Sequence, residues 1–426
     1  MSANQPLAHP RPTVAVIGSG PSGCYTAQFL RKELSGAEIS IFEAMPVPYG
    51  LVRYGVAADH QGTKAVTRQF DRMFERSDVS FVGNTRIGVD IDFETITGAF
   101  DIVVIATGLP DDRALPIPRD DDAHVIGAGR LLRTLNAFPE EAAVSAPPLD
   151  EELGDDLIVV GQGNVAVDVV RLLTKPSHHL TGSDIHDRAR DLLRPTPPKT
   201  IRVLGRSPAE NAKFDLAMLR ELCGLDSIDI DVDGLDDSTQ GPVAELLRHA
   251  QQQPPATTQG DSTERTRVTF HFETVPTAVR RDDAHTVLDV TDESGKTTSF
   301  AADTVITAIG FCQADGNRDD VPAAAWSGAH VYRVGWLDRG GRGNIAENRK
   351  HAQMVAKTIV ADVVSGVIAH GAPGLAAIEP QLPPTTVGFA GWQAIDEAER
   401  RNADAQRCRR KITDLDEMLA IAHAAS

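Results

Sequence analysis

The chain contains 426 residues, and at roughly 150 residues per domain this length predicts two or three domains. Apolar residues make up 41%, enough for buried cores, which excludes a wholly disordered chain. Lysine and arginine number 42 against 60 acidic residues, so the net charge is −18. Such an acidic chain is a poor general binder of nucleic acid or anionic membranes, because like charges repel.

The cysteines are few and far apart. Cys24, Cys223, Cys312 and Cys408 form no C-x-x-C pair, which excludes a cysteine-ligated zinc or iron–sulfur site and a redox-active disulfide motif. Sparse cysteines are typical of a reducing cytosol, and we predict no metal site. The first twelve residues lack the segments of a secretory signal, and no run of about 18 apolar residues occurs, so we expect no leader and no membrane span.

In chain order, the first informative region is a glycine-rich loop between a strand and a helix. The apolar run 13–17 is typical of a buried parallel strand, and G-S-G-P-S-G at 18–23 follows it as a complete G-x-G-x-x-G. Apolar residues then recur at helical spacing over 24–34. A second apolar run, 38–42, ends at Glu43, 20 residues after the last glycine, where a ribose-binding carboxylate is expected.

Each glycine in this loop has a physical reason. Gly18 permits a tight turn, Gly20 lets the backbone approach a pyrophosphate, and Gly23 lets the helix pack closely against the strand. The N-terminus of the following helix offers free N–H groups and a partial positive charge to phosphates. Because all the parts occur in order, we interpret this region as a dinucleotide-binding unit.

A second unit of the same kind follows later in the chain. The apolar run 157–160 leads into G-Q-G-N-V-A at 161–166, a G-x-G-x-x-A, and helically spaced apolar residues come next. A further apolar run, 201–204, ends in Gly205 and Arg206 rather than in an acid. The order of parts therefore predicts a second dinucleotide site.

The residue at each strand end predicts the dinucleotide. An acid such as Glu43 accepts a hydrogen bond from a free ribose 2′-OH, whereas Arg206 can pair with a 2′-phosphate. We therefore predict that the first unit binds flavin adenine dinucleotide (FAD) and that the second binds NADP(H). The runs 100–108 and 304–310, which end in A-T-G and A-I-G, resemble the closing strand of each nucleotide domain in flavoenzymes with two dinucleotides.

Three polar stretches are expected at the surface. The chain before residue 201 is longer than usual and predicts an insertion with one helix. The stretch 251–266 predicts a mobile loop, and the Asp-rich stretch 226–237 predicts a solvated edge. His178 and His179 have no further ligands at metal-like spacing, so we interpret them as exposed.

Four segments together indicate a family. The segment 42–60, which reads F-E-A-M-P-V-P-Y-G-L-V-R-Y-G-V-A-A-D-H, closely resembles the segment after the ribose acid in adrenodoxin-reductase-like ferredoxin–NADP(+) reductases. The loop 161–168 resembles that family's NADP loop. The segment 335–348 resembles its C-terminal flavin-contacting segment, and 391–396 resembles its tail. The resemblance covers nearly the whole chain in the same order.

The resemblance implies which residues contact the cofactors. For FAD it implies Gly18, Gly20, Pro21, Ser22, Gly23, Glu43, Leu51, Ile87, Trp336, Gly343, Asn344 and Ile345. For NADP(H) it implies Arg113, Gly163, Asn164, Val165, Ala166 and Arg206. It also implies that His60 and Glu221 lie near the point where flavin and nicotinamide meet, which makes them the candidate catalytic residues.

The chain departs from the family pattern at charged positions. The family sequence G-R-R-G-P reads G-R-S-P-A here, so Ser207 replaces a second arginine, which weakens the case for strong NADPH preference. Lys213 is a candidate substitute, and Met218 stands where the family has a glutamate. Arg342 and Glu347 add charge close to the expected flavin or nicotinamide. We interpret the chain as a divergent member of the family.

The resemblance implies flavin-mediated electron transfer. A hydride passes from NADPH to FAD, and single electrons then go to a ferredoxin-type iron–sulfur protein. His60 is expected to tune flavin protonation or to guide the nicotinamide, with a packed structural histidine as the alternative. For Glu221 we favour a supporting role over acid–base catalysis, with a surface carboxylate as the alternative.

Two other functions stay open on the sequence. The same fold could act directly on a small organic substrate, or it could be a catalytically inactive nucleotide-binding regulatory protein. The lack of a cysteine pair disfavours a disulfide reductase.

An acidic iron–sulfur partner requires a local basic face on this acidic chain. Three clusters are candidates, each with an ordinary solvated charge run as its alternative. They are Arg188, Arg190, Arg194 and Lys199; Arg339, Arg342, Arg349 and Lys350; and Arg400, Arg401, Arg407, Arg409, Arg410 and Lys411. We expect no nucleic-acid or membrane partner, and the oligomeric state stays open.

We predict an α/β architecture with two Rossmann-type dinucleotide-binding domains. The FAD domain is discontinuous, with residues 1–112 and 331–426, and the NADP(H) domain, 113–330, is inserted. This follows because the flavin-contacting segment comes after the second glycine motif. The N-terminus lacks an amphipathic, Arg-rich presequence, which favours a bacterial cytoplasm over a mitochondrial matrix.

Overall fold

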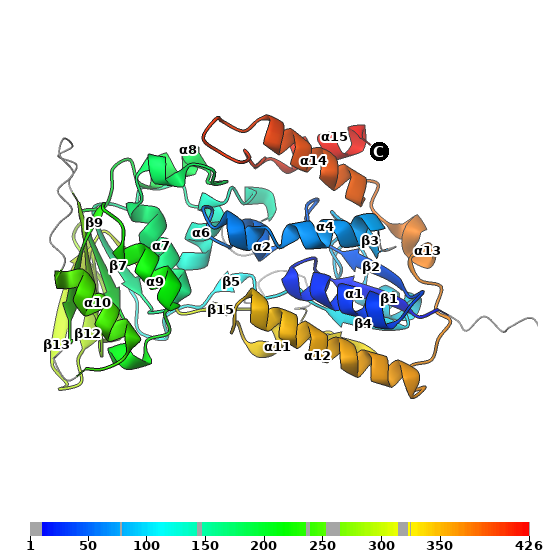
Figure 1. Cartoon of the computed structure of the whole chain (residues 1–426), viewed down its shortest axis with the longest axis horizontal. Coiled ribbons are helices and arrows are strands. Elements are labelled where there is room, and N and C mark those ends of the chain that lie inside the picture. The colour runs from blue at the N-terminus through cyan, green and yellow to red at the C-terminus, as the bar shows by residue number, and fades with distance from the viewer. Residues whose placement is uncertain are drawn as a thin grey trace, which may run out of the picture.

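The computed structural model of the protein describes residues 11–76, 79–142, 147–235, 239–252, 265–313, 323 and 325–425. Most of the predicted mobile loop, residues 253–264, lies outside this described part. Two halves lie side by side along the long axis, each built around its own parallel sheet (Figure 1).

A five-stranded parallel sheet organises the first half. Its order is β16-β4-β1-β2-β3, so one late strand joins four strands from the N-terminal part of the chain. The strands are β1 (Thr13–Ile17), β2 (Glu38–Phe42), β3 (Val79–Val82), β4 (Ile102–Ile105) and β16 (Val331–Arg333). The position of β16 makes this half discontinuous in sequence.

Helices cover both faces of this sheet because its strands are apolar on both sides. Val14 and Val16 of β1 face one buried cluster, whereas Ala15 and Ile17 face another. The first cluster is completed by α1 (Pro21–Glu33), α2 (Leu51–Tyr54), α4 (Thr67–Arg76), α12 (Ile345–Val364), α14 (Phe389–Arg401) and α15 (Leu415–Ala424). The second is completed by α5 (Phe93–Ala99) and α13 (Leu375–Ile378). The short helices α3 (Gln61–Lys64) and α11 (Trp336–Arg339) complete this half.

A six-stranded parallel sheet organises the second half, in the order β6-β14-β7-β8-β10-β9. The strands are β6 (Val125–Gly127), β7 (Asp156–Val160), β8 (Thr200–Leu204), β9 (Ile228–Asp233), β10 (Thr266–His271) and β14 (Thr304–Thr307). The Asp-rich stretch forms the edge strand β9, where Asp231 and Asp233 are exposed, so the predicted solvated edge is confirmed over its described residues.

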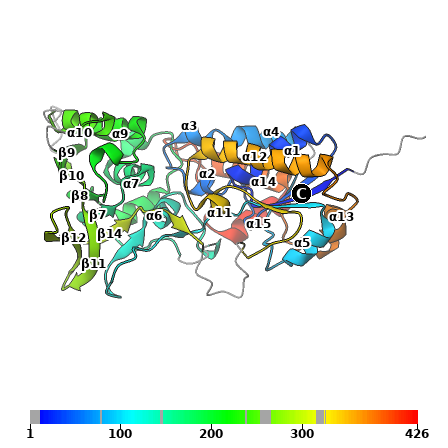
Figure 2. The same ribbon diagram turned by 90° about the horizontal axis from the view of Figure 1, so that it is seen from below.

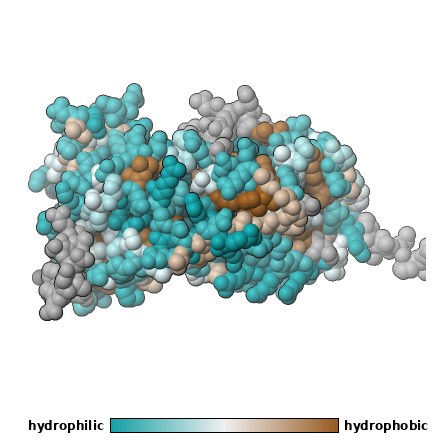
Figure 3. Space-filling model, turned by 90° about the horizontal axis from the view of Figure 1, so that it is seen from above, coloured by the Kyte–Doolittle hydropathy of each residue, from teal (hydrophilic) through white to brown (hydrophobic). Residues whose placement is uncertain are grey.

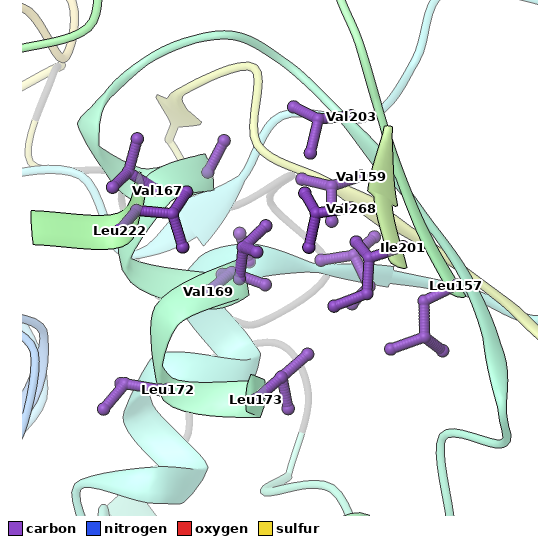
Figure 4. Close-up of a cluster of buried hydrophobic side chains, with 14 of the residues drawn as sticks. Leu157, Val159, Val167, Val169, Leu172, Leu173, Ile201, Val203, Leu222 and Val268 are labelled. Carbon is purple, nitrogen blue, oxygen red and sulfur yellow. The ribbon is translucent and has the colours of Figure 1, made fainter. Parts of the chain in front are cut away.

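The two faces of this sheet pack against different partners. Leu157 and Val159 of β7 face the helices, and Figure 4 shows them with Val167 of α7. Ile158 and Val160 face a three-stranded antiparallel sheet of β11 (Val275–Asp282), β12 (His285–Thr291) and β13 (Thr297–Ala302). The helices of this half are α6 (Ala128–Leu135), α7 (Asn164–Thr174), α8 (Asp187–Leu193), α9 (Leu216–Cys223) and α10 (Pro242–Gln252). The helix predicted in the insertion before residue 201 is α8.

Two short strands lie where the chain passes between the halves. β5 (Asp111–Asp112) follows the first part of the discontinuous half, and it pairs antiparallel with β15 (Phe311–Cys312). The predicted α/β fold with two Rossmann-type units, one of them interrupted by the other, is confirmed. The boundaries at 112/113 and 330/331 stay a prediction.

The loop between α14 and α15 also reaches the second half (Figure 1). Gln406 O accepts a hydrogen bond from Gly182 N at 2.7 Å. Arg407 makes two hydrogen bonds to Asp187 at the start of α8, at 2.9 and 2.6 Å. The C-terminal segment therefore ties the two halves together.

Over the described ranges, no helix is long and apolar enough to cross a membrane, and no group of three or more His, Cys, Asp or Glu residues is arranged to hold a metal ion. The face shown in Figure 3 is mostly hydrophilic.

Candidate functional site

The first glycine loop joins β1 to α1 and leaves space at one position. Gly18 has φ +108°, and a Cβ added there would lie 2.6 Å from Ala106 O. A Cβ on Gly23 would lie 2.0 Å from Gly18 O, so the helix packs on the turn without room for a side chain. Around Gly20, a Cβ would meet nothing within 4 Å. This open space at the loop is the room that a pyrophosphate needs.

The second glycine loop, between β7 and α7, repeats this geometry. Gly161 has φ +134°, and a Cβ there would lie 2.3 Å from Ala308 O, while Gly163 again has open space. Residues 164–166 form the first turn of α7, with Ala166 fully buried. Neither α1 nor α7 has a side-chain cap or an acidic residue in its first turn. Both helix starts therefore favour an anion, and both loops fit a dinucleotide pyrophosphate.

The carboxylate of Glu43 is fixed at the end of β2. Its Oε2 accepts hydrogen bonds from the backbone N and the Oγ of buried Ser19, at 3.0 and 2.5 Å. Its Oε1 accepts from Met45 N at 3.2 Å. Because Glu43 is only partly buried, the loop holds the carboxylate in place while leaving it accessible to a ligand hydroxyl.

The structural counterpart of Glu43 in the second unit is Gly205, not Arg206. In each unit the first glycine of the loop donates its N–H to the last residue of the second strand, to Phe42 O or to Leu204 O, at 2.8 Å. Glu43 and Gly205 therefore follow equivalent strand ends, and Arg206 lies one residue further along the chain.

The side chain of Gln162 occupies the place of an acid in the second unit. A Cβ on Gly205 would lie 1.9 Å from Gln162 Cδ and Oε1. Gln162 Nε2 donates to His271 O at 3.0 Å, while its buried Oε1 has no hydrogen-bond partner within the described part of the chain. Arg206 is exposed and makes no ion pair with any described residue, which leaves it available to a 2′-phosphate.

Residues from the C-terminal part border the first site. Gly335 follows β16 and lies against α1, since a Cβ there would lie 2.2 Å from Ser22 Oγ. Trp336 stacks on Phe311, with ring centroids 5.0 Å apart, and donates from Nε1 to Gly343 O at 3.1 Å. An aromatic pair therefore lies where β15 approaches the first half.

The helix α12 starts beside this aromatic pair. Asn344 is its N-cap residue and accepts from Glu347 N at 3.1 Å, and Ile345 is the first helical residue. The Glu347 carboxylate lies 3.5 Å from the Arg339 guanidinium, whereas Arg342 is exposed. Of the two charges that depart from the family pattern, Glu347 therefore has an opposite charge beside it.

The other three predicted contact residues lie in different surroundings. Leu51 begins α2, and the preceding Gly50 approaches the first glycine loop. Ile87 is buried in the core on the α5 side of the first sheet. Arg113 lies between the halves, where its NH2 group donates to Phe311 O at 3.3 Å.

His60 contacts the second half from the first. Its Nε2 lies 3.4 Å from Glu221 Oε2 on α9, and its Nδ1 lies 3.6 Å from Asp168 Oδ1 on α7. The side chains of His60 and Glu221 are 21% and 40% exposed, so both remain accessible to a ligand. The structure thus brings together the two residues that the sequence selected as catalytic candidates.

Two buried cations lie behind this pair. The Arg171 side chain is fully buried, and it bonds to Asp59 at 3.0 Å, to Asp168 at 2.8 Å and to Glu221 at 3.1 Å. Lys175 Nζ lies 2.7 Å from both Asp59 and Glu221. We call Asp59, His60, Asp168, Arg171, Lys175 and Glu221 the junction cluster.

The charges of the junction cluster shift the pKa values of its acids. Burial raises the pKa of Asp59, but hydrogen bonds from Arg171 and Lys175 outweigh it and lower the pKa to about 2. Burial also acts to raise the pKa of Glu221, and the same two cations lower it overall. The pKa of Asp168 is raised, mainly by burial. Asp59 and Glu221 are therefore ionised at neutral pH and hold Arg171 between the halves.

Four members of the junction cluster were not predicted from the sequence. Asp168, Arg171 and Lys175 recur at i, i+3 and i+7 along one face of the helix after the second glycine loop, and this spacing was the available signal. Asp59 precedes His60, but its pairing with Arg171 spans 112 residues and left no local pattern.

Two of the three basic clusters expected as docking faces are exposed only in part. Arg190 and Arg194 are 7% exposed and donate to the backbone O of Lys175. Lys411 is buried beside Asp184, 3.0 Å away. Arg190 and Arg194 thus bond within the second half, whereas Lys411 bonds to it from the C-terminal segment, and none of the three is exposed. The exposed members of these two clusters are Arg188, Lys199, Arg400, Arg401 and Arg410. The cluster of Arg339, Arg342, Arg349 and Lys350 has exposed cations at its last three members.

Comparisons with known proteins fit these observations. Residues 12–211 match the family model described as pyridine nucleotide-disulphide oxidoreductase. The chain is 41% identical to cindoxin reductase of Citrobacter braakii, covering 96% of this chain and 91% of that protein. It is 28% identical to the mitochondrial NADPH:adrenodoxin oxidoreductase of Salvelinus fontinalis, covering 100% and 93%.

A solved structure matches over the same extent. The chain is 31% identical to the NADPH-ferredoxin reductase FprA of Mycobacterium tuberculosis, covering 96% of this chain and 98% of that protein. The structure of FprA in complex with NADPH superposes with a TM-score of 0.82 at 28% identity, covering 97% of this chain and 100% of the other.

Proposed function

Because the chain belongs to the family of adrenodoxin-reductase-like ferredoxin–NADP(+) reductases, with FAD and NADP(H) as its cofactors, we propose that it oxidises NADPH and passes electrons singly to a ferredoxin-type iron–sulfur protein. Bound FAD supplies the chemistry that links a two-electron donor to a one-electron acceptor. The contact of His60 with Glu221 carries the proposal, because it joins two dinucleotide-binding units in one chain.

The residues at the junction have distinct roles in this proposal. The two glycine loops hold the pyrophosphates, and Glu43 holds the adenosine ribose of FAD. His60 has a carboxylate near each ring nitrogen, so it can hold a proton at Nδ1 or Nε2 and stays in one orientation. His60 then positions the nicotinamide, while Arg171 and Lys175 keep Glu221 ionised beside it.

A basic face on the first half is the proposed docking surface for the partner. Figure 2 shows α4, α1 and α12 side by side along one face. Two shallow hollows flank α1. One is lined by Phe29, Ala346, Arg349, Lys350 and Gln353, and the other by Gln28, Arg31, Lys32, Gln69, Arg72, Met73 and Arg76.

The charge of this face fits an acidic partner. None of the residues lining the two hollows is an aspartate or glutamate, although the chain as a whole has a net charge of −18. Such a face attracts an acidic protein, and the attraction weakens as salt rises. We therefore expect the rate of electron transfer to the partner to fall with ionic strength.

The first experiment is the anaerobic visible spectrum of the FAD-loaded protein before and after one equivalent of NADPH, with NADH in parallel. We expect rapid bleaching by NADPH and recovery of the spectrum when an oxidised ferredoxin is added. A spectrum that neither nucleotide bleaches would refute NADPH oxidation and favour a regulatory protein. Bleaching without recovery on any ferredoxin would favour direct action on a small organic substrate.

A further inference from the structure

We propose that Lys213 is a further nucleotide-binding residue, which contacts the pyrophosphate of NADP(H). The inference rests on the proposed function, because it adds a residue to the site for the same nucleotide. The sequence offered Lys213 only as a substitute for a missing arginine near the 2′-phosphate. The tertiary contacts of its segment favour a different phosphate.

The backbone of Lys213 is paired with the second glycine loop. Lys213 N donates to Gln162 O at 3.1 Å. The same residue forms an isolated parallel bridge with Gly163, the glycine with open space around it. The backbone of Lys213 therefore lies beside Gly163, the position in the second glycine loop that a pyrophosphate would approach.

The residues after Lys213 hold it in this position. Phe214 is buried and packs edge-on against Phe270 of β10, with ring centroids 5.8 Å apart. Asp215 N donates to Asn164 Oδ1 at 2.7 Å, at the start of α7. Because Phe214 is buried in the core and Lys213 is exposed, the two side chains lie on opposite sides of the segment.

Among the described residues, no carboxylate forms an ion pair with the ammonium group of Lys213. The Lys213 side chain is exposed. The nearby Asp215 uses its Oδ1 as the cap of α9, accepting from Ala217 N at 2.9 Å and Met218 N at 3.2 Å. The positive charge is therefore available to a ligand.

The positions of the two cations assign them to different phosphates. Arg206 follows the end of β8, where the ribose of the nucleotide is recognised. Lys213 is paired with Gly163 at the start of α7, where the pyrophosphate is recognised. The flexible stem of lysine allows its ammonium to reach a phosphate beside its own backbone. We assign the 2′-phosphate to Arg206 and the pyrophosphate to Lys213.

Isothermal titration of the FAD-loaded protein with NADP⁺ and with adenosine 2′-monophosphate separates the two roles, because the second ligand lacks the pyrophosphate. Lys213→Gln should weaken NADP⁺ binding about tenfold, as for loss of one charge-assisted hydrogen bond, and leave adenosine 2′-monophosphate binding unchanged. Lys213→Arg should bind NADP⁺ like the wild type. Arg206→Gln should weaken both ligands.

Two kinds of control accompany the Lys213 titrations: a variant of a distant lysine and a check of folding. Lys296→Gln removes an exposed lysine from the loop between β12 and β13 and should change neither affinity. The flavin spectrum and far-UV circular dichroism check each fold, and Lys213→Glu serves as a second variant that should weaken NADP⁺ further. Unchanged NADP⁺ affinity in Lys213→Gln and Lys213→Glu, or an equal loss for both ligands, would overturn the pyrophosphate assignment. Failure of the wild type to bind NADP⁺ would instead refute the proposed function.

Discussion

Replacing Asp59 by asparagine preserves the shape of the side chain but removes a charge shared by two buried cations. Arg171 has no exposed side-chain surface, and Lys175 has 8%. Without the Asp59 charge, both cations keep Asp168 or Glu221 as partners but lose their link to the first half. We therefore expect Asp59→Asn to destabilise the protein and to loosen the contact between the halves.

The magnitude follows from the pKa of Asp59. Its lowering from 3.8 to about 2 corresponds to roughly 2.5 kcal/mol of stabilisation at neutral pH. Because the folded-state pKa lies below the unfolded value, this stabilisation is complete above about pH 5 and is lost as the pH falls through about 2. The Asp59→Asn variant should therefore lose about 2–3 kcal/mol, equally at about pH 7 and pH 9.

Equilibrium urea unfolding of the FAD-loaded protein, followed by far-UV circular dichroism at both pH values, measures this loss. The control is Glu397→Gln, which breaks an exposed ion pair with Arg401 on α14 and should leave the unfolding midpoint unchanged. If Asp59→Asn were as stable as the wild type, or if its loss differed between the two pH values, the role assigned to Asp59 would be wrong.

Three other variants test separate parts of the structure. The double variant Gly205→Glu/Gln162→Ser gives the second unit the acid and small residue of the first, and should lower NADP⁺ affinity at least about tenfold while raising NAD⁺ affinity, measured by isothermal titration. Lys411→Met removes a buried cation and should lower the free energy of unfolding by about 3 kcal/mol, measured by urea unfolding. Arg72→Glu/Arg76→Glu should raise the KM for an acidic ferredoxin severalfold at low salt and leave the KM for NADPH unchanged; an unchanged ferredoxin KM would exclude the α4–α1–α12 face.

The sequence by itself determined the two dinucleotide-binding units and their order. The positive φ at Gly18 and Gly161 is a local requirement of each turn, and it favours glycine before any tertiary contact is considered. Strand, glycines, helix and second strand lie within about 30 residues in the first unit and about 50 in the second, so their order can be followed along the chain. The segment 42–60, which ends at His60, indicated the family because it too is continuous in the sequence.

Only the tertiary structure decided which charges meet and which are buried. Arg171 reaches Asp59 across 112 residues, and Gln162 fills the space beside Gly205 where an acid would otherwise lie. Arg190 looks like part of a solvated charge run in the sequence, yet it is buried. Segments that are distant in the chain pair with these long charged side chains and remove them from water. A local sequence pattern cannot predict such neighbours.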